Sequence, residues 1–298
     1  MATTVHATAP TADKYYIPHS SGWPIYGSVT LFTLMLGACG WLNEWYGPGL
    51  LALGFALLVG LFIGWFNVVI GESQSGMYNQ QVDVSFRMGM MWFIFSEVMF
   101  FAAFFGALFY ARQFSVPWLG GEGVRIFNKI LLWQNFDNSW PSNGPSKVSP
   151  REDGSFEVIP AFGLPAINTA ILLLSGITIT IAHHALKVGQ RNILKVFLAA
   201  TFLLGFLFVY LQAIEYMHAY HELGLKLSTG IYGSTFFMLT GFHGFHVTLG
   251  AVMLLVIWLR TLKGHFTPKA HFAFEAVAWY WHFVDVVWLG LFIFVYWV

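Results

Sequence analysis

The chain has 298 residues, of which 57% are hydrophobic and only 9% are charged, against about 25% charged residues in soluble domains. Its formal net charge is zero, which excludes the basic surface that nucleic-acid binding requires. A single cysteine, Cys39, excludes an internal disulfide and a copper centre built on two thiolates. This composition is typical of a protein with several membrane-spanning helices, and we expect an all-α integral membrane fold.

The N-terminal residues 1–22 are polar and rich in Thr and Ala, and we expect a cytoplasmic arm. Two apolar stretches follow at about 24–41 and 50–70, each long enough to span a bilayer. Gly47-Pro48-Gly49 breaks the helical pattern between them, which predicts a tight hairpin and a two-helix unit at 23–71. Gly60 and Gly64 in the second stretch are spaced to let another helix approach closely.

The third apolar stretch, residues 88–111, contains one formally charged residue, Glu97. At a rise of 1.5 Å per residue it would lie roughly 15 Å inside a hydrocarbon layer about 30 Å thick. An ionisable group at that depth is a functional-site hypothesis. The alternative is a protonated glutamic acid that forms a hydrogen bond to a neighbouring helix.

Four more apolar stretches, at about 162–186, 196–214, 231–259 and 272–298, complete seven predicted membrane helices, the fifth of which should extend one or two turns past Ile214. A polar loop at about 113–160 separates the third helix from the fourth, inside a predicted five-helix unit at 72–298. The short connections on one side hold most of the Lys and Arg residues. The positive-inside rule therefore predicts a cytoplasmic N-terminus and an extracytoplasmic C-terminus.

Polar residues recur within the last two predicted helices. Glu275, His282 and Asp285 fall within roughly 80° on one helix arc, and His243 and His246 are three residues apart. A polar stripe in a membrane helix faces protein or water rather than lipid. A bis-histidine haem or a copper site from His243, His246 and His282 is one interpretation, and structural hydrogen bonding between helices or to a neighbouring subunit is the other.

Several segments resemble the cytochrome c oxidase subunit III family. The segments are Phe93-Ile-Phe-Ser-Glu-Val-Met-Phe-Phe101, Ser175-Gly with Ala182-His-His-Ala-Leu186, Gln212-Ala-Ile-Glu-Tyr216, Tyr232-Gly-Ser-Thr-Phe-Phe, Thr240-Gly-Phe-His-Gly-Phe-His-Val and the long run from Phe274 to Leu289. The resemblance covers nearly the whole chain from about Ile17.

The resemblance implies seven helices, split two plus five around a lipid-filled cleft, and a non-redox accessory subunit of a proton-pumping oxidase that reduces O2 to water. It implies that this subunit has no catalytic residue and binds no metal, that haems and copper belong to partner subunits, and that the chain packs mainly on subunit I in a complex with subunit II. It also implies bound phospholipid, support of proton uptake, and cytochrome c as the donor to the complex. By the same resemblance, Glu97 is the family's buried carboxylate, and the lipid-binding positions are Trp65, Glu72, Arg260, Lys263 and His265.

The predicted loop is longer than in animal mitochondrial members, which, with the N-terminal arm, favours a bacterial inner-membrane protein. Three alternatives stay open. The chain could be an independent proton or ion transporter that uses Glu97 with Glu275 and Asp285, a haem-bearing membrane oxidoreductase, or subunit III of a quinol oxidase. The presence of the first two helices favours the cytochrome c type over the quinol type.

Overall fold

The computed structural model describes residues 15–18 and 20–297, so most of the predicted N-terminal arm lies outside the described residues. Within these residues all regular structure is helical, which confirms the all-α prediction. Seven helical segments in this part of the chain are long and apolar enough to cross a membrane, as predicted. The chain forms two compact units, Met1–Met88 and Gly89–Val298, and the predicted division at 71/72 stays a prediction.

The N-terminal unit contains a helical hairpin of α1 (Trp23–Leu42) and α2 (Gly49–Gln74). The two helices pack closely because glycines lie at their contact. A Cβ atom on Gly37 would come within 2.5 Å of the backbone nitrogen of Leu51, and one on Gly54 within 2.6 Å of the Cα atom of Leu34. Gly60 and Gly64 lie instead against aromatic side chains of α1. Gly60 faces the Tyr26 hydroxyl, and Gly64 makes room for the Trp23 ring.

Helix α3 (Gln80–Tyr110) continues without a break through a π-helical turn, η1 (Ala111–Ser115), into α4 (Val116–Leu119). The helical segment therefore ends at Leu119 and includes the first seven residues of the predicted loop at 113–160, and Arg112 lies in the π-helical turn. Pro117 lies in the first turn of α4, directly after the π-helical turn.

Two short helical turns, η2 (Gly123–Arg125) and η3 (Asn128–Leu132), follow α4. The rest of the loop packs on the connection between α6 (Arg191–His221) and α7 (Gly230–Leu262) and on the start of α7. The Glu157 N–H donates to the Leu223 carbonyl (2.9 Å), and the Tyr232 N–H donates to the Ser142 carbonyl (3.1 Å). Beside these contacts, hydrogen bonds from Ser155 lower the pKa of the exposed Asp153 carboxyl.

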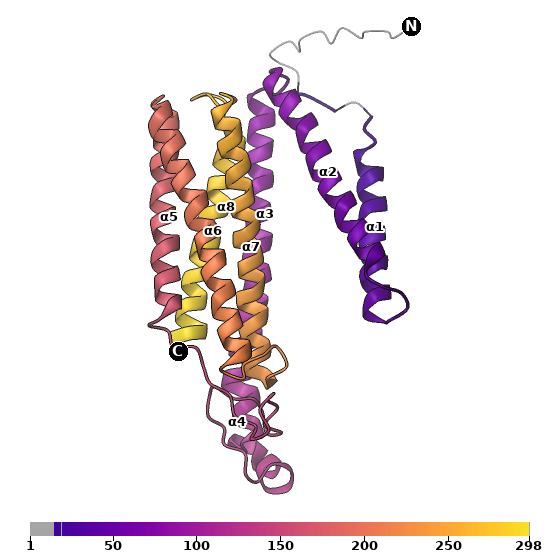
Figure 1. Cartoon of the computed structure of the whole chain (residues 1–298), viewed down its shortest axis with the longest axis vertical. Coiled ribbons are helices and arrows are strands. Elements are labelled where there is room, and N and C mark those ends of the chain that lie inside the picture. The colour runs from indigo at the N-terminus through magenta and orange to yellow at the C-terminus, as the bar shows by residue number, and fades with distance from the viewer. Residues whose placement is uncertain (1–14, 19, 298) are drawn as a thin grey trace. The chain divides into compact units, whose positions relative to one another are not determined.

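Four helices, α5 (Leu164–Lys187), α6 (Arg191–His221), α7 (Gly230–Leu262) and α8 (Phe272–Leu291), form an antiparallel bundle (Figure 1). Each contacts the next along the chain, and α5 also contacts α8, so the four close into a ring. Helix α6 ends at His221, two turns beyond Ile214, as predicted. A π-helical turn, η4 (Phe292–Trp297), extends α8.

The bundle core is organised around Trp281, whose side chain is fully buried. Its indole fills a slot that two glycines leave open, because a Cβ atom on Gly205 or Gly250 would lie 2.6 Å or 2.9 Å from the ring. The indole N–H donates to the Ser175 hydroxyl (2.9 Å). One α8 side chain therefore contacts α5, α6 and α7 together.

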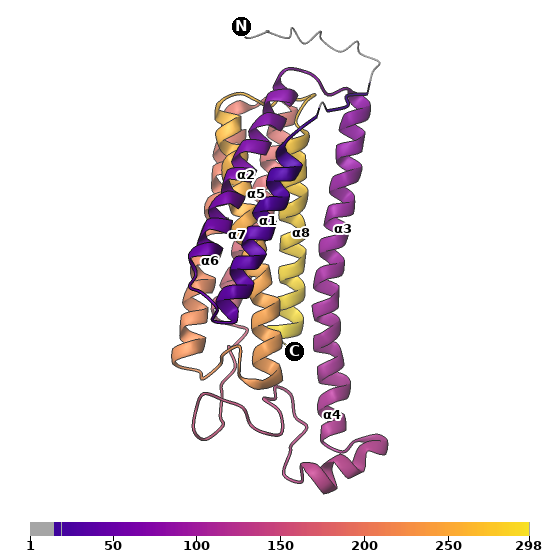
Figure 2. The same ribbon diagram turned by 90° about the vertical axis from the view of Figure 1, so that its right-hand side faces the viewer.

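From Gly89 onward α3 runs along the bundle beside α8 (Figure 2). Aromatic side chains rather than close backbone contacts connect it to the bundle. Ring centroids are 6.3 Å apart for Phe93 and Tyr280, and 5.1 Å apart for Phe100 and Phe242. This packing brings the middle of α3, with Glu97, against α7.

Candidate functional site

Glu97 forms a hydrogen bond to His246 across 149 residues of sequence, with Oε2 and Nε2 2.9 Å apart. Glu97 lies on α3 and His246 on α7, so the carboxyl group bonds to a neighbouring helix. The side chains are only 22% and 10% exposed, respectively. The sequence identified both residues, but nothing in it indicated that they meet.

The partners of His246 define where its protons lie. Its Nδ1 is 2.6 Å from the Phe242 carbonyl, which can only accept, so Nδ1 carries a proton. The bond from Nε2 to Glu97 then contains one proton, held either by a neutral glutamic acid or by an imidazolium facing a carboxylate. In both arrangements the pair carries no net charge, which removes the cost of an isolated charge in an apolar layer.

Aromatic rings surround the His246 side of the Glu97–His246 pair. The His246 ring has its centroid 5.1 Å from Phe101, 6.0 Å from Phe100 and 6.4 Å from Tyr280. The buried Tyr280 hydroxyl donates to the His246 carbonyl (3.3 Å), which ties this turn of α7 to α8. The pair therefore sits where α3, α7 and α8 come together.

His243, one turn before His246, points into the bundle core. It is 1% exposed, and its Nε2 donates to the Val284 carbonyl at 3.2 Å. Phe208 and Trp288 lie against its ring, with centroids 5.6 Å and 5.1 Å away. The structure does not bring His243, His246 and His282 together, because each side chain has its own partner on a different element.

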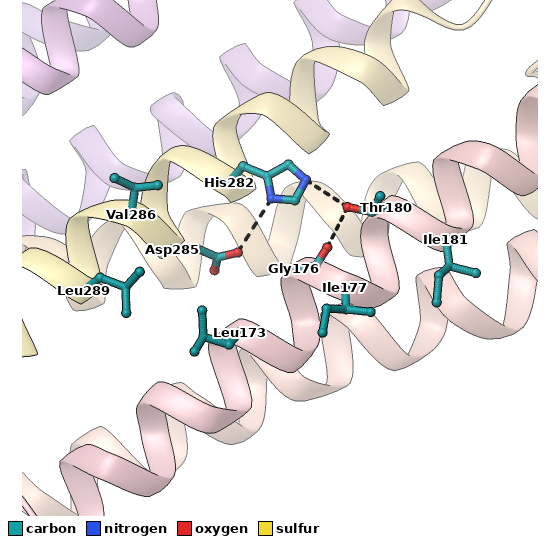
Figure 3. A pocket seen from close by; sticks show the side chains of 9 residues that line it. All are labelled: Leu173, Gly176, Ile177, Thr180, Ile181, His282, Asp285, Val286 and Leu289. Atoms are coloured by element: carbon teal, nitrogen blue, oxygen red, sulfur yellow. Dashed lines mark hydrogen bonds and ion pairs between the residues drawn. The ribbon is translucent and has the colours of Figure 1, made fainter.

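His282 and Asp285 line a shallow pocket of about 390 Å³ between α5 and α8 (Figure 3). The Thr180 hydroxyl donates to the Gly176 carbonyl (2.8 Å), so it accepts from His282 Nε2 at 3.3 Å. The other His282 nitrogen faces Asp285 Oδ2 at 3.8 Å, which is too long for a hydrogen bond. Asp285 is 7% exposed, and its Oδ1 is buried without a hydrogen-bond partner among the described residues.

Glu275, the third member of the predicted polar arc, lies seven residues before His282 on α8, about two helical turns away, with His183 and His271 around it. All three residues of the arc thus contact or approach α5. Nothing in the sequence indicated that His183 and His271 lie close to Glu275.

A buried carboxylate that sequence analysis did not select is Glu215, which is 1% exposed on α6. The Tyr296 hydroxyl donates to its Oε1 at 2.6 Å, and the Gln212 amide donates to the same oxygen at 3.3 Å. The sequence signal was present, because Glu215 is the one carboxylate in an otherwise apolar stretch of α6. The contacts connect α6 to η4 and indicate a structural role.

Two of the predicted lipid-binding residues lie in the N-terminal unit. The Trp65 side chain is exposed on α2. Both Glu72 oxygens accept phenol hydrogen bonds, from Tyr16 (2.9 Å) and from Tyr78 (2.7 Å). Burial and the Glu72 carboxylate raise the pKa of both phenols.

The other three predicted lipid-binding residues lie at the end of α7 in the C-terminal unit. The Arg260 guanidinium stacks over the Phe266 ring, 4.6 Å from its centroid. Lys263, the C-cap residue of α7, is exposed. Burial, together with the positive charges of Arg260 and Lys263, lowers the pKa of His265, so these three residues present a cluster of two permanent cations and an imidazole.

Comparison with known proteins identifies the chain. The family model described as Cytochrome c oxidase subunit III matches residues 13–127 and 124–298. Cytochrome c oxidase subunit 3 of Mus musculus is 41% identical over 284 residues, which cover 95% of this chain and 96% of the relative. The proteins of the same name from Gadus morhua and Coturnix japonica are each 39% identical over 287 residues, covering 96% of this chain and 97% of each relative.

The resemblance found in the sequence is therefore confirmed, and so are the multi-pass membrane fold and the assignment to an oxidase complex. The chain belongs to the cytochrome c oxidase subunit III family and is an accessory subunit of that oxidase.

Proposed function

We propose that this subunit carries no redox centre and instead supports the catalytic subunit, by holding an ordered helix surface and phospholipid beside it and by sustaining proton uptake. The observation that carries the proposal is the Glu97–His246 hydrogen bond. It secures α3 to α7 by a polar contact, whereas the other α3 side chains in the core are apolar and mostly aromatic. Breaking this bond should loosen α3 and whatever lipid or subunit lies against it.

The main protein contact we propose is with oxidase subunit I, in a complex that also contains subunit II and accepts electrons from cytochrome c. The α5–α8 pocket supports a protein contact, because a polar group in a membrane helix faces protein or water and not lipid. His282 is partly exposed there and Asp285 Oδ1 has no hydrogen-bond partner among the residues described. A polar side chain of the neighbouring subunit would meet the exposed His282 ring there and cover the pocket above Asp285.

We propose that phospholipid headgroups bind at the positions the family resemblance indicates. Arg260 and Lys263 supply positive charge at one membrane boundary, where lipid phosphates are attracted, and the His265 imidazole lies beside them as a further hydrogen-bonding group. Trp65 and Glu72 are the proposed contacts in the N-terminal unit, with Tyr16 and Tyr78 holding Glu72 in place. The two-plus-five arrangement of helices around a lipid-filled cleft stays a prediction.

For the location we propose a bacterial inner membrane, with the N-terminus in the cytoplasm and the C-terminus in the periplasm. The support is the distribution of Lys and Arg over the short connections and the long segment after α3. Reporter fusions at each terminus of the full chain test the orientation.

The test of the proposed function uses the intact oxidase with Glu97→Ala. We expect fewer turnovers before inactivation and less phospholipid per complex than in the wild type. Glu152→Ala, at an exposed loop carboxylate, is the matched control and should change neither quantity. If Glu97→Ala also leaves both unchanged, the proposed role is wrong.

Two alternatives predict different results. An independent transporter would need Glu97, Glu275 and Asp285 along one path, whereas Glu97 contacts α7 and the other two lie toward α5. Ion transport by the chain in vesicles without the other subunits would support it. A quinol oxidase would consume O2 with reduced quinol but not with reduced cytochrome c.

A further inference from the structure

Three side chains with metal-binding atoms meet at one end of the helical bundle, on α5 and α8 rather than at the Glu97–His246 bond between α3 and α7. His183, His271 and Glu275 each offer one ligand atom, and these atoms all lie within 4.8 Å of one another. All three side chains are partly buried, and no other such group occurs among the residues that the structure describes.

The local structure of two antiparallel helices explains why the three meet. His271 is the N-cap of α8 and Glu275 lies in its first turn, so a spacing of four residues puts both on one face. His183 lies in the last turn of α5, which contacts α8. The His183 and His271 rings are 5.6 Å apart between centroids and tilted by 65°, so they meet edge to face.

The hydrogen bond at His271 Nδ1 leaves the Nε2 atom available to bind a metal ion. Its Nδ1 is 3.1 Å from the Thr267 carbonyl, which can only accept, so Nδ1 carries the proton. In the neutral imidazole the lone pair is then on Nε2. Metal-binding histidines usually have this arrangement, in which a backbone carbonyl orients the ring through its other nitrogen.

We propose that His183, His271 and Glu275 bind a zinc ion. Two imidazoles and one carboxylate form a ligand set that zinc accepts with water as the fourth ligand, whereas Mg²⁺ and Ca²⁺ require oxygen ligands. Ligand atoms about 2.0–2.2 Å from a tetrahedral zinc lie about 3.4 Å apart, so the widest pair closes by at most about 1.4 Å. Rotation of partly exposed side chains at helix ends supplies that movement.

The electrostatics of the two helix ends are compatible with a cation. The N-terminus of α8 carries a partial positive charge and the C-terminus of α5, next to it, a partial negative charge, so the two dipoles largely cancel at the site. The Glu275 carboxylate adds a negative charge. A bound zinc ion would crosslink α5 to α8 at this end of the bundle.

The experiment measures zinc bound to the purified oxidase complex after equilibrium dialysis against buffered Zn²⁺. The wild-type complex should bind one more zinc ion than complexes carrying His183→Gln, His271→Gln or Glu275→Gln. Loss of one ligand should weaken this zinc by more than about tenfold, since loss of an outer-shell partner already costs 10–100-fold. Because zinc bound elsewhere in the complex is the same in the wild type and the variants, the difference in zinc content reports this site alone.

His184→Gln is the matched control, because His184 is the exposed neighbour of His183 and does not belong to the cluster. It should retain the wild-type zinc content. Equal zinc content in the wild type and in His271→Gln, or an equal loss in His184→Gln, would overturn the proposal. A second measurement, which needs no variant, is anomalous diffraction from zinc in wild-type crystals of the complex. It should show a peak among the three side chains. Zinc peaks only at other positions would also overturn the proposal.

Discussion

The N-terminal hairpin and the C-terminal bundle solve the same problem, helix packing in an apolar solvent, in two different ways. In the hairpin, Gly37 and Gly54 allow backbone atoms of α1 and α2 to approach directly. In the bundle, large aromatic side chains fill the space and hydrogen bonds fix them, as with Trp281 on Ser175 and Trp288 on Thr169 (both 2.9 Å).

Both kinds of packing follow from the absence of water between membrane helices. Without water, burial of apolar side chains no longer drives helices together, so packing and interhelical hydrogen bonds must do so. The hairpin depends mainly on shape and should therefore be sensitive to a single added methyl group. The bundle combines shape with polar contacts and should be sensitive to loss of an aromatic anchor.

The largest expected effect is that of Trp281→Ala in the bundle. Removing a fully buried indole that contacts three helices should destabilise the subunit by about 3–5 kcal/mol. The temperature at which the subunit is lost from the detergent-solubilised oxidase measures this. Ser175→Ala removes only the acceptor of the Trp281 hydrogen bond and should cost about 1–3 kcal/mol. An equal loss of stability in both variants would show that the volume of the indole does not account for the effect of Trp281→Ala.

The next effect is that of Gly54→Ala in the hairpin. Its new methyl group would lie 2.6 Å from the Leu34 Cα atom, and such overpacking costs about 1–3 kcal/mol, more than the roughly 1 kcal/mol that alanine gains over glycine in a helix. Gly60→Ala is the control, because its methyl group meets only the Tyr26 hydroxyl at 3.1 Å. The same thermal assay should rank Gly54→Ala below the wild type and Gly60→Ala near it; the reverse order would contradict the packing account.

The smallest effect concerns the two phenols on Glu72. Because the pKa values of Tyr16 and Tyr78 are raised in the fold, their contribution to stability is present below about pH 10 and is lost as the pH rises through the raised values. Glu72→Gln should lower both pKa values toward that of an ordinary tyrosine, though burial, the larger cause, remains. A titration of tyrosinate absorbance should show earlier ionisation in the variant; identical curves would mean that Glu72 has no such influence.

The sequence predicted the seven helices because each apolar run is bounded by charges or by Gly and Pro. It placed the end of the third helix too early, because Arg112 looked like a boundary, whereas a π-helical turn carries the helix on to Leu119. It also read Gly60 and Gly64 as the point of close approach, although the backbones approach most closely at Gly37 and Gly54.

The candidate site was predictable in its residues but not in its pairings. Glu97 stood out because charge is rare in membrane helices, yet its partner is 149 residues away and depends on which face α3 presents to α7. The same limit applies to His183, which comes from a different helix than His271 and Glu275. Periodicity defines the faces of one helix but not which neighbour each face meets.

The most direct test of the account is a double-mutant cycle on Glu97 and His246 in the intact oxidase. The measured quantity is the number of turnovers before inactivation in Glu97→Ala, His246→Ala and the double variant. If the two residues act through the hydrogen bond that joins α3 to α7, the double variant should inactivate no faster than the more impaired single variant. Independent, multiplying losses in the double variant would contradict the account.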